Sequence, residues 1–296
     1  MTLQEIIDFT RYQLGNYEKP YYWVDAELVM YCNRVIDQLC TEGRLLVDDC
    51  TPSVCDIALV EGQRDYSYSE KILSIISARL VKEEVMTLDV APATAWAADD
   101  TITGLASTST CVVVSKTSDT KYVVKQRTGN YNLGEILTNG TVQADQGATK
   151  PVFTDSDAVY LTAITREQLE SRYPNWLSDD TDEPIFYCVD NVPGKLSIHP
   201  VPDDIYTLRL TVQRLPITAM STSSMTATPE LDVKYHNAII DGICGYAHLK
   251  AGENTYNDKA ASLYMSLFKK AILDNKIRKM LDRSVPRTFS PHGGFI

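Results

Sequence analysis

The chain has 296 residues, of which 44% are hydrophobic, enough for one large domain or two small ones with an ordinary core. Its formal net charge is −11, which argues against general nucleic-acid binding, because that depends on Lys and Arg neutralising phosphates. No stretch approaches the roughly 18 consecutive apolar residues of a membrane span, so no membrane partner is expected.

The cysteines indicate a reducing environment. There are seven, an odd number, and none forms a CxxC pair, so neither a disulfide framework nor a zinc site is expected. The N-terminus is charged and amphipathic and lacks the apolar core of a signal peptide. We therefore expect assembly in the cytoplasm.

Amphipathic helices are predicted at both ends of the chain. Thr2 and Glu5 form a capping box that opens the first helix, and a second helix follows Asp25. Near the C-terminus, Gly242 and Gly245 lie within a long helix and favour close helix packing. The apolar face of the last helix is expected to contain Leu263, Leu267, Ile277 and Leu281, with Tyr264, Phe268 and Ile272 nearby.

The middle of the chain has a β character. Residues 91–157 are rich in Thr, Ser and Gly between short runs of β-formers, which predicts a small barrel or sandwich. Outside this segment, residues 79–90 read as a strand and Ile205 to Leu215 alternates like a half-buried strand. A hairpin turn is predicted at residues 191–194, and Thr165 with Gln168 forms a second capping box.

These elements predict an α+β fold. A discontinuous helical-bundle body, residues 1–90 and 158–282, would contain a β-hairpin and strand region. Residues 91–157 would form an inserted all-β module, and residues 283–296 an extended C-terminal tail.

Charge is distributed unevenly along the chain. After residue 268 there are seven Lys and Arg against two Asp, a net charge of +5, so the first 268 residues carry −16. Such a basic end is explained either by cations at the C-terminus of a helix, where they suit the helix dipole, or by a tail that docks on an acidic partner.

No constellation in the sequence indicates catalysis, a cofactor or a metal. Cys244 and His248 have the spacing of a nucleophile and its base, but a packed helix interior explains them better. The acidic cluster at residues 178–183 lacks the pattern of a calcium loop. Trp96, with Tyr122 and Tyr131, would suit either a sugar-stacking platform or the core of a β module.

The order of several weak motifs resembles the head–tail connector (adaptor) proteins of tailed bacteriophages. The motifs are YWVDAEL (22–28), IFY after a proline (185–187), LSIHPVP (196–202), LP (215–216), LDVKYHNAI (231–239) and AASLY (260–264). The resemblance covers about residues 2–90 and 158–281.

This resemblance implies a structural virion protein, not an enzyme, at the head–tail interface. Such adaptors form a ring, twelve-fold in the family, beneath the portal protein. The ring extends the channel through which genomic DNA passes without specific binding, and gives tail or nozzle proteins a platform. The residues that the family pattern assigns to portal contact are Arg283, Arg287, Phe289, Phe295 and Ile296.

Two other functions fit the same sequence. A carbohydrate-binding or cell-wall-degrading virion component would use the β module and Trp96. A tail-tube or tail-completion subunit would share the fold and differ only in its position in the virion.

Overall fold

The computed structural model describes residues 1–16, 18–178, 180–189, 194–252 and 255–284, and their side chains as far as Ile277. It separates two units, Met1–Leu46 with Arg214–Ile296, and Val47–Gln213. One hydrophobic cluster fills the first unit and three smaller clusters lie in the second.

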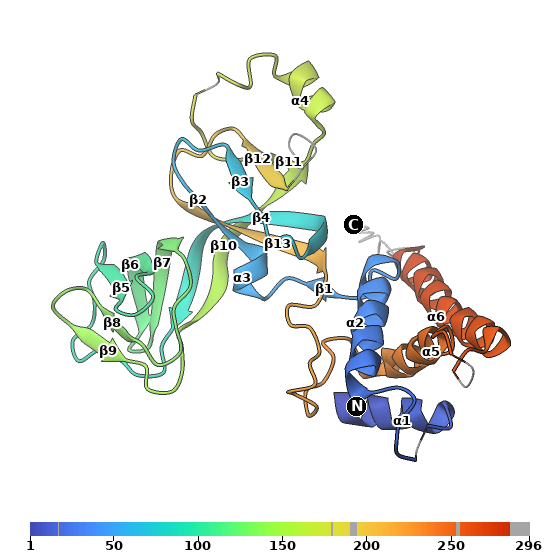
Figure 1. Cartoon of the computed structure of the whole chain (residues 1–296). Coiled ribbons are helices and arrows are strands. Elements are labelled where there is room, and N and C mark those ends of the chain that lie inside the picture. Colours follow the sequence, from blue (N-terminus) through green and yellow to red (C-terminus); the bar gives the residue numbers. More distant parts are fainter. Residues whose placement is uncertain (17, 179, 190–193, 253–254, 285–296) are drawn as a thin grey trace, which may run out of the picture. The chain divides into compact units, whose positions relative to one another are not determined.

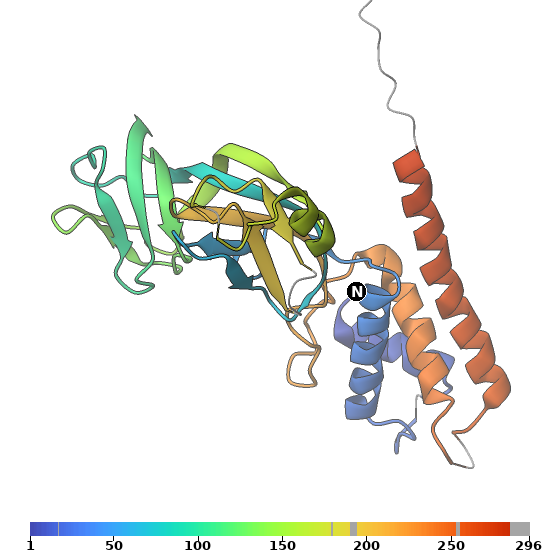
Figure 2. The same ribbon diagram turned by 90° about the horizontal axis from the view of Figure 1, so that it is seen from above.

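The first unit consists of helices packed around α5 (His236–Ala247). α1 (Leu3–Gln13), α2 (Asp25–Thr41) and α6 (Asp258–Ser284) each contact α5, which the 3-10 helix η1 (Val233–Tyr235) precedes. α5 lies between α2 and α6 (Figure 2).

Close packing around α5 follows from its small residues. Most of α5 is buried, and a β-carbon placed on Gly242 would lie 2.7 Å from both methyl groups of Val35 in α2. The prediction that Gly242 permits close helix packing is therefore confirmed. The capping box of Thr2 and Glu5 is also confirmed, with both of its hydrogen bonds present.

α6 differs from its predicted orientation. Phe268 and Ile272 are buried against the rest of the unit, whereas Leu263, Leu267 and Ile277 are exposed. The apolar face predicted from these three leucine and isoleucine positions is thus the outer face, and Leu281 lies among the residues whose side chains are not described. Periodicity identified an apolar stripe but not the side of the helix that faces the core.

The second unit is built on a mixed sheet in which 13 strands are hydrogen-bonded. Its strands are β1 (Val47–Asp48), β2 (Asp56–Leu59), β3 (Asp65–Ser67), β4 (Ile72–Thr87), β5 (Thr101–Gly104), β6 (Thr110–Ser118), β7 (Lys121–Thr128), β8 (Ile136–Thr138), β9 (Gln143–Asp145), β10 (Val152–Ala163), β11 (Phe186–Cys188), β12 (Lys195–His199) and β13 (Tyr206–Arg214). Two short helices, α3 (Pro52–Cys55) and α4 (Arg166–Arg172), accompany them.

The long strands β4 and β10 connect the parts of this sheet. The strand order is β3-β12-β11-β10-β4-β7-β6-β5-β8-β9, and β13 pairs with β1, β2 and β4. Figure 1 shows β4 and β10 running from the group β5–β9 towards β3, β11 and β12. β10 and β11 are parallel, and the other strand pairs whose registers are known are antiparallel.

The predicted fold class is wrong in its main feature. Over the described residues the protein is mostly a large β-sheet, with six α-helices that make this part 28% helical, and not a helical-bundle body. Residues 47–90 and 158–213, assigned to that body, supply β1–β4, the second half of β10, and β11–β13. The strands of the expected barrel or sandwich join the same sheet, because β7 pairs with β4. The predicted turn at residues 191–193 lies outside the described residues.

Replacing Gly242 by alanine should destabilise the helical unit. The new methyl group would lie 2.7 Å from two carbons of Val35, a buried β-branched side chain with little freedom to turn. Overpacking of this kind costs about 1–3 kcal/mol. We expect a lower unfolding midpoint by scanning calorimetry.

Gly245→Ala is the matched control on the same helix. Its methyl group would meet Met265 at 3.0–3.1 Å, and that flexible side chain can shift. Gly245→Ala should therefore be neutral or stabilising through its better helix propensity. Equal losses in the two variants would contradict the tight contact between α2 and α5.

Candidate functional site: an arginine–carboxylate network

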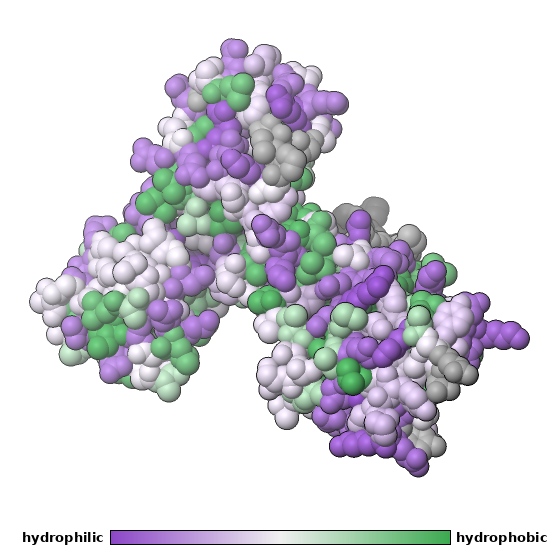
Figure 3. All heavy atoms as spheres, in the orientation of Figure 1, coloured by the Kyte–Doolittle hydropathy of each residue, from purple (hydrophilic) through white to green (hydrophobic). Residues whose placement is uncertain are grey.

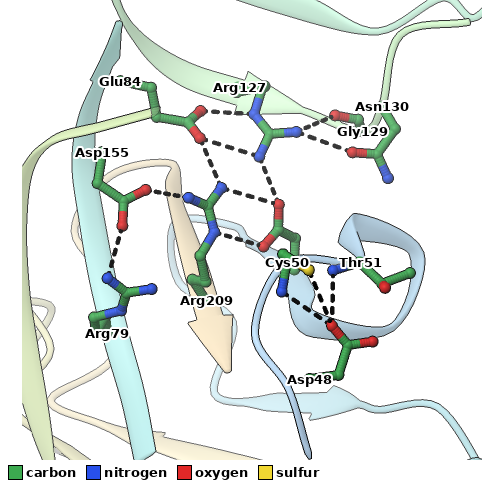
Figure 4. Close-up of polar contacts among 11 residues, drawn as sticks. Asp48, Cys50, Thr51, Arg79, Glu84, Arg127, Gly129, Asn130, Asp155 and Arg209 are labelled. Carbon is green, nitrogen blue, oxygen red and sulfur yellow. Dashed lines mark hydrogen bonds and ion pairs between the residues drawn. The ribbon is translucent and has the colours of Figure 1, made fainter. Parts of the chain in front are cut away.

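The most concentrated group of interacting charges in the described residues is a network within the sheet unit (Figure 4). It consists of three arginines and three carboxylates, namely Arg79, Arg127, Arg209, Asp56, Glu84 and Asp155. Strands β2, β4, β7, β10 and β13 supply them. The formal charges of the six side chains cancel.

Strand register brings these residues together. Arg209 on β13 lies directly opposite Asp56 on β2, and Asp155 on β10 lies opposite Glu84 on β4. Arg127 is brought to them by an irregularity in β7. Gln126 has φ +54°, a left-handed conformation, and the buried positions of β7 shift from Tyr122 and Val124 to Arg127. This bulge turns Arg127 towards Glu84.

Arg127 uses every branch of its guanidinium group. Its Nε donates to Glu84 Oε2 at 2.6 Å, and its Nη2 donates to Asp56 Oδ2 at 2.8 Å. Its Nη1 donates to the carbonyl oxygen of Gly129 and to Asn130 Oδ1, each at 3.0 Å. The side chains of Arg127 and Glu84 are only 5% and 4% exposed, so this contact is shielded from solvent.

Arg209 joins the remaining carboxylates. Its Nε donates to Asp56 Oδ1 at 2.9 Å, and its Nη2 donates to Glu84 Oε1 at 2.9 Å. Its Nη1 pairs with Asp155 Oδ1, and Asp155 Oδ2 lies 3.1 Å from Nη1 of Arg79. Figure 4 shows the Arg209 guanidinium between Glu84 and Asp155.

The surroundings keep both central arginines charged. Burial by itself lowers the pKa of Arg127, but Glu84 and Asp56 outweigh that effect, so its pKa is raised. Burial likewise opposes the charge of Arg209, and Asp56, Asp155 and Glu84 raise its pKa. A cation desolvated in this way is stable only while its carboxylates remain.

The network lies where two hydrophobic clusters meet. On β4, Ala78 and Leu80 belong to one cluster and Met86 to another, and Glu84 lies between Leu80 and Met86 along the strand. A cavity of about 400 Å³ adjoins the network, and Asp49 and Lys150 are among the other residues that line it.

This arrangement is suited to a structural role, in which ion pairs join five strands of the sheet, and not to catalysis. Both oxygens of Asp56, Glu84 and Asp155 already accept from, or pair with, arginines, so none is poised to take a proton from a substrate. Among the described residues, no group of three or more His, Cys, Asp or Glu is placed to hold a metal ion. Sequence reasoning missed this network, because its members are isolated charges on separate strands.

The residues predicted to contact a portal protein lie at the end of the chain. Arg283 falls in the last turn of α6, where the backbone alone is described. Arg287, Phe289, Phe295 and Ile296 lie outside the described residues. Their role stays a prediction.

The pair Cys244 and His248 does not form a reactive thiol. Cys244 is buried, its Sγ donates to Gln13 Oε1 at 3.2 Å, and burial raises its pKa to about 12. The thiol is therefore protonated at neutral pH. His248 stacks on Tyr264 with ring centroids 5.8 Å apart, and both residues act as packing groups.

The β-module aromatics are core residues. Trp96 is 3% exposed, its Nε1 donates to the carbonyl oxygen of Val142 at 3.4 Å, and its ring centre is 5.3 Å from that of Tyr122. Tyr122 and Tyr131 are also buried. In this conformation the three rings offer no face on which a sugar could stack.

Comparison with known proteins identifies a family. A family model described as SU10 adaptor protein matches residues 117–291, more than half of the chain. The match includes Arg127, Asp155 and Arg209 of the network. No curated protein matches the sequence significantly. In the described part of the chain, no helix is both long and apolar enough to cross a membrane.

Replacing Arg127 by methionine should destabilise the sheet unit strongly. The change keeps most of the side-chain volume but leaves Glu84 and Asp56 with one fewer cation in a buried site. Breaking a buried pair in this way costs about 3–5 kcal/mol. Scanning calorimetry should show the loss in the transition of this unit.

Two further variants make the test specific. Adding Glu84→Gln should restore part of the lost stability, because it balances the network at two arginines and two carboxylates. Lys116→Met removes the solvent-exposed ion pair with Asp119 and should leave the midpoint nearly unchanged. If Arg127→Met behaves like Lys116→Met, the network does not hold the sheet together.

Proposed function

This chain belongs to the SU10 adaptor family of bacteriophage structural proteins, and we propose that it is a head-to-tail connector subunit of the virion. In this proposal, copies of the chain form a ring beneath the portal protein, with twelve subunits as the family pattern implies. The observation that carries the proposal is the family match over residues 117–291.

The charge distribution supports such a channel. Because each chain has a net charge of −11, the ring would be negatively charged and would repel the phosphates of DNA, so the genome could pass without binding. In the proposal the DNA makes no specific contact, no cofactor is used, and tail or nozzle proteins bind the face of the ring opposite the portal. The strands within residues 91–157 would contact those neighbouring proteins.

The end of the chain is proposed as the portal-binding segment. The basic residues after 268 contrast with the acidic remainder of the chain, so in the proposal this end of the chain docks on an acidic surface of the portal protein. In a ring, each weak tail contact is repeated by every subunit, so avidity would strengthen the attachment.

A tail-tube or tail-completion role is the remaining alternative, and it differs in position rather than in fold. Labelling the protein in an electron-microscopy reconstruction of the virion distinguishes the two. The carbohydrate-binding alternative loses the part of its motive that rested on Trp96, because that side chain is buried in the core of the β strands.

Removing residues 285–296 should weaken portal binding and leave the fold intact. The deletion ends the chain after Ser284, the last residue of α6, so every described helix and strand is kept. We expect unchanged circular dichroism and an apparent affinity for the portal protein of the same phage that is lower by about tenfold or more. Co-sedimentation measures the binding.

Arg172→Ala is the control for the lost charge. Like the deletion, it removes one positive charge, but from an exposed position on α4. It should bind the portal protein normally. A truncated chain that binds the portal protein as tightly as the full chain would show that the contact lies elsewhere.

A further inference from the structure

The outer face of α6 carries an apolar stripe without a partner among the described residues of its unit. Leu263, Leu267, Leu273 and Ile277 are 59%, 42%, 55% and 46% exposed. Their spacing places them within about a third of the helix circumference, since each residue turns the helix by about 100°. The buried Phe268 and Ile272 lie on the opposite side.

Order along a helix distinguishes this stripe from ordinary surface residues. On the face that Figure 3 shows, hydrophobic residues form several separate groups, and single exposed apolar side chains are normal. Four of them in one row over four helical turns provide the kind of contact that helices make with other helices.

Lysines accompany the stripe. Lys259 and Lys270 fall within the same arc as the apolar residues, and Lys269 and Lys276 lie on its flank. Asp274 is the acidic residue within the arc. The outer face of α6 is therefore apolar and mainly positive.

The outer face of α1 has the complementary composition. Glu5, Asp8, Phe9 and Tyr12 are exposed at spacings of three and four residues, so they share one side of α1. Phe9 and Tyr12 are 56% and 77% exposed. This face is aromatic and negative, whereas the inner face of α1, with Leu3, is buried.

We propose that the outer face of α6 of one copy packs against the outer face of α1 of the next copy. The proposal rests on the ring proposed above and names the surfaces that would build it. α1 and α6 each contact α5 through their buried faces, so the outer face of each points away from α5. The two faces on one copy are thus available to two different neighbours.

The contact is heterologous, because two different surfaces meet. Heterologous contacts repeat from copy to copy and close into a ring when the rotation between copies allows. A contact between two α6 faces would end at a dimer and would bring lysines such as Lys270 together, which like charge disfavours. Pairing α6 with α1 instead sets Lys270 beside Asp8, with Tyr12 near Leu267 when the two helices run antiparallel.

Cysteine cross-linking tests the geometry directly. Cys50 is the exposed cysteine of the seven, so Cys50→Ser provides the background. In it, Tyr12→Cys together with Leu267→Cys should give a ladder of cross-linked multimers with a bifunctional maleimide, ending at the ring number. Each single variant should stay monomeric on a denaturing gel.

The outcomes separate this proposal from the proposed function. Dimers from Leu267→Cys alone would show that two α6 faces meet and would overturn the heterologous contact. If light scattering shows multimers of the unaltered protein but the double variant gives no ladder, the ring stands and these surfaces are wrong. If the protein is monomeric both alone and on the portal protein, the ring and its interface both fail.

Charge reversal supplies an independent test. Lys270→Glu should raise the concentration needed for assembly by about tenfold, and Asp8→Lys in the same chain should restore it. Lys195→Glu, which reverses an exposed lysine on β12, is the matched control and should assemble normally. Failure of Asp8→Lys to rescue the Lys270→Glu variant would overturn the pairing of these two faces.

Discussion

The guanidinium groups of Arg127 and Arg209 lie between strands that are far apart in the chain, and their charge is compensated by Asp56, Glu84 and Asp155. β4 contributes to one hydrophobic cluster through Leu80 and to another through Met86, with Glu84 between them. The network therefore lies at the boundary between two hydrophobic clusters. A slip of β4 or β13 by one residue would bury these charges unpaired, so the network also fixes strand register.

Much of the local structure could be predicted from the sequence, because its signals are local. The capping boxes at Thr2 and Thr165 and the alternating strand ending near Leu215 depend on residues only a few positions apart. The dominance of the sheet could not be predicted in this way. β4 pairs with β7, β10 and β13, and no short-range pattern says that one strand will have these three partners.

The network was missed for a related reason. Alternation in β13 places Arg209 on the face opposite Leu208 and Leu210, which on its own indicates a solvent-facing residue. The structure covers that face with Glu84 and Asp155 from other strands. The left-handed backbone at Gln126, which turns Arg127 inward, is also hard to foresee, because Gly or Asn usually occupies such a position.

The division of charge links these features to assembly. The six network charges cancel inside the sheet unit, so the net charge of −11 belongs to the rest of the chain. A surface of that sign repels both DNA and other copies, and copies must still associate if the chain forms a ring. In the proposed contact between copies, lysines beside the apolar stripe of α6 would face acids beside the aromatics of α1, so apolar burial would supply the affinity while charge selects which faces meet. The same acidity that would keep DNA from binding would then direct each copy to the basic face of α6 on its neighbour.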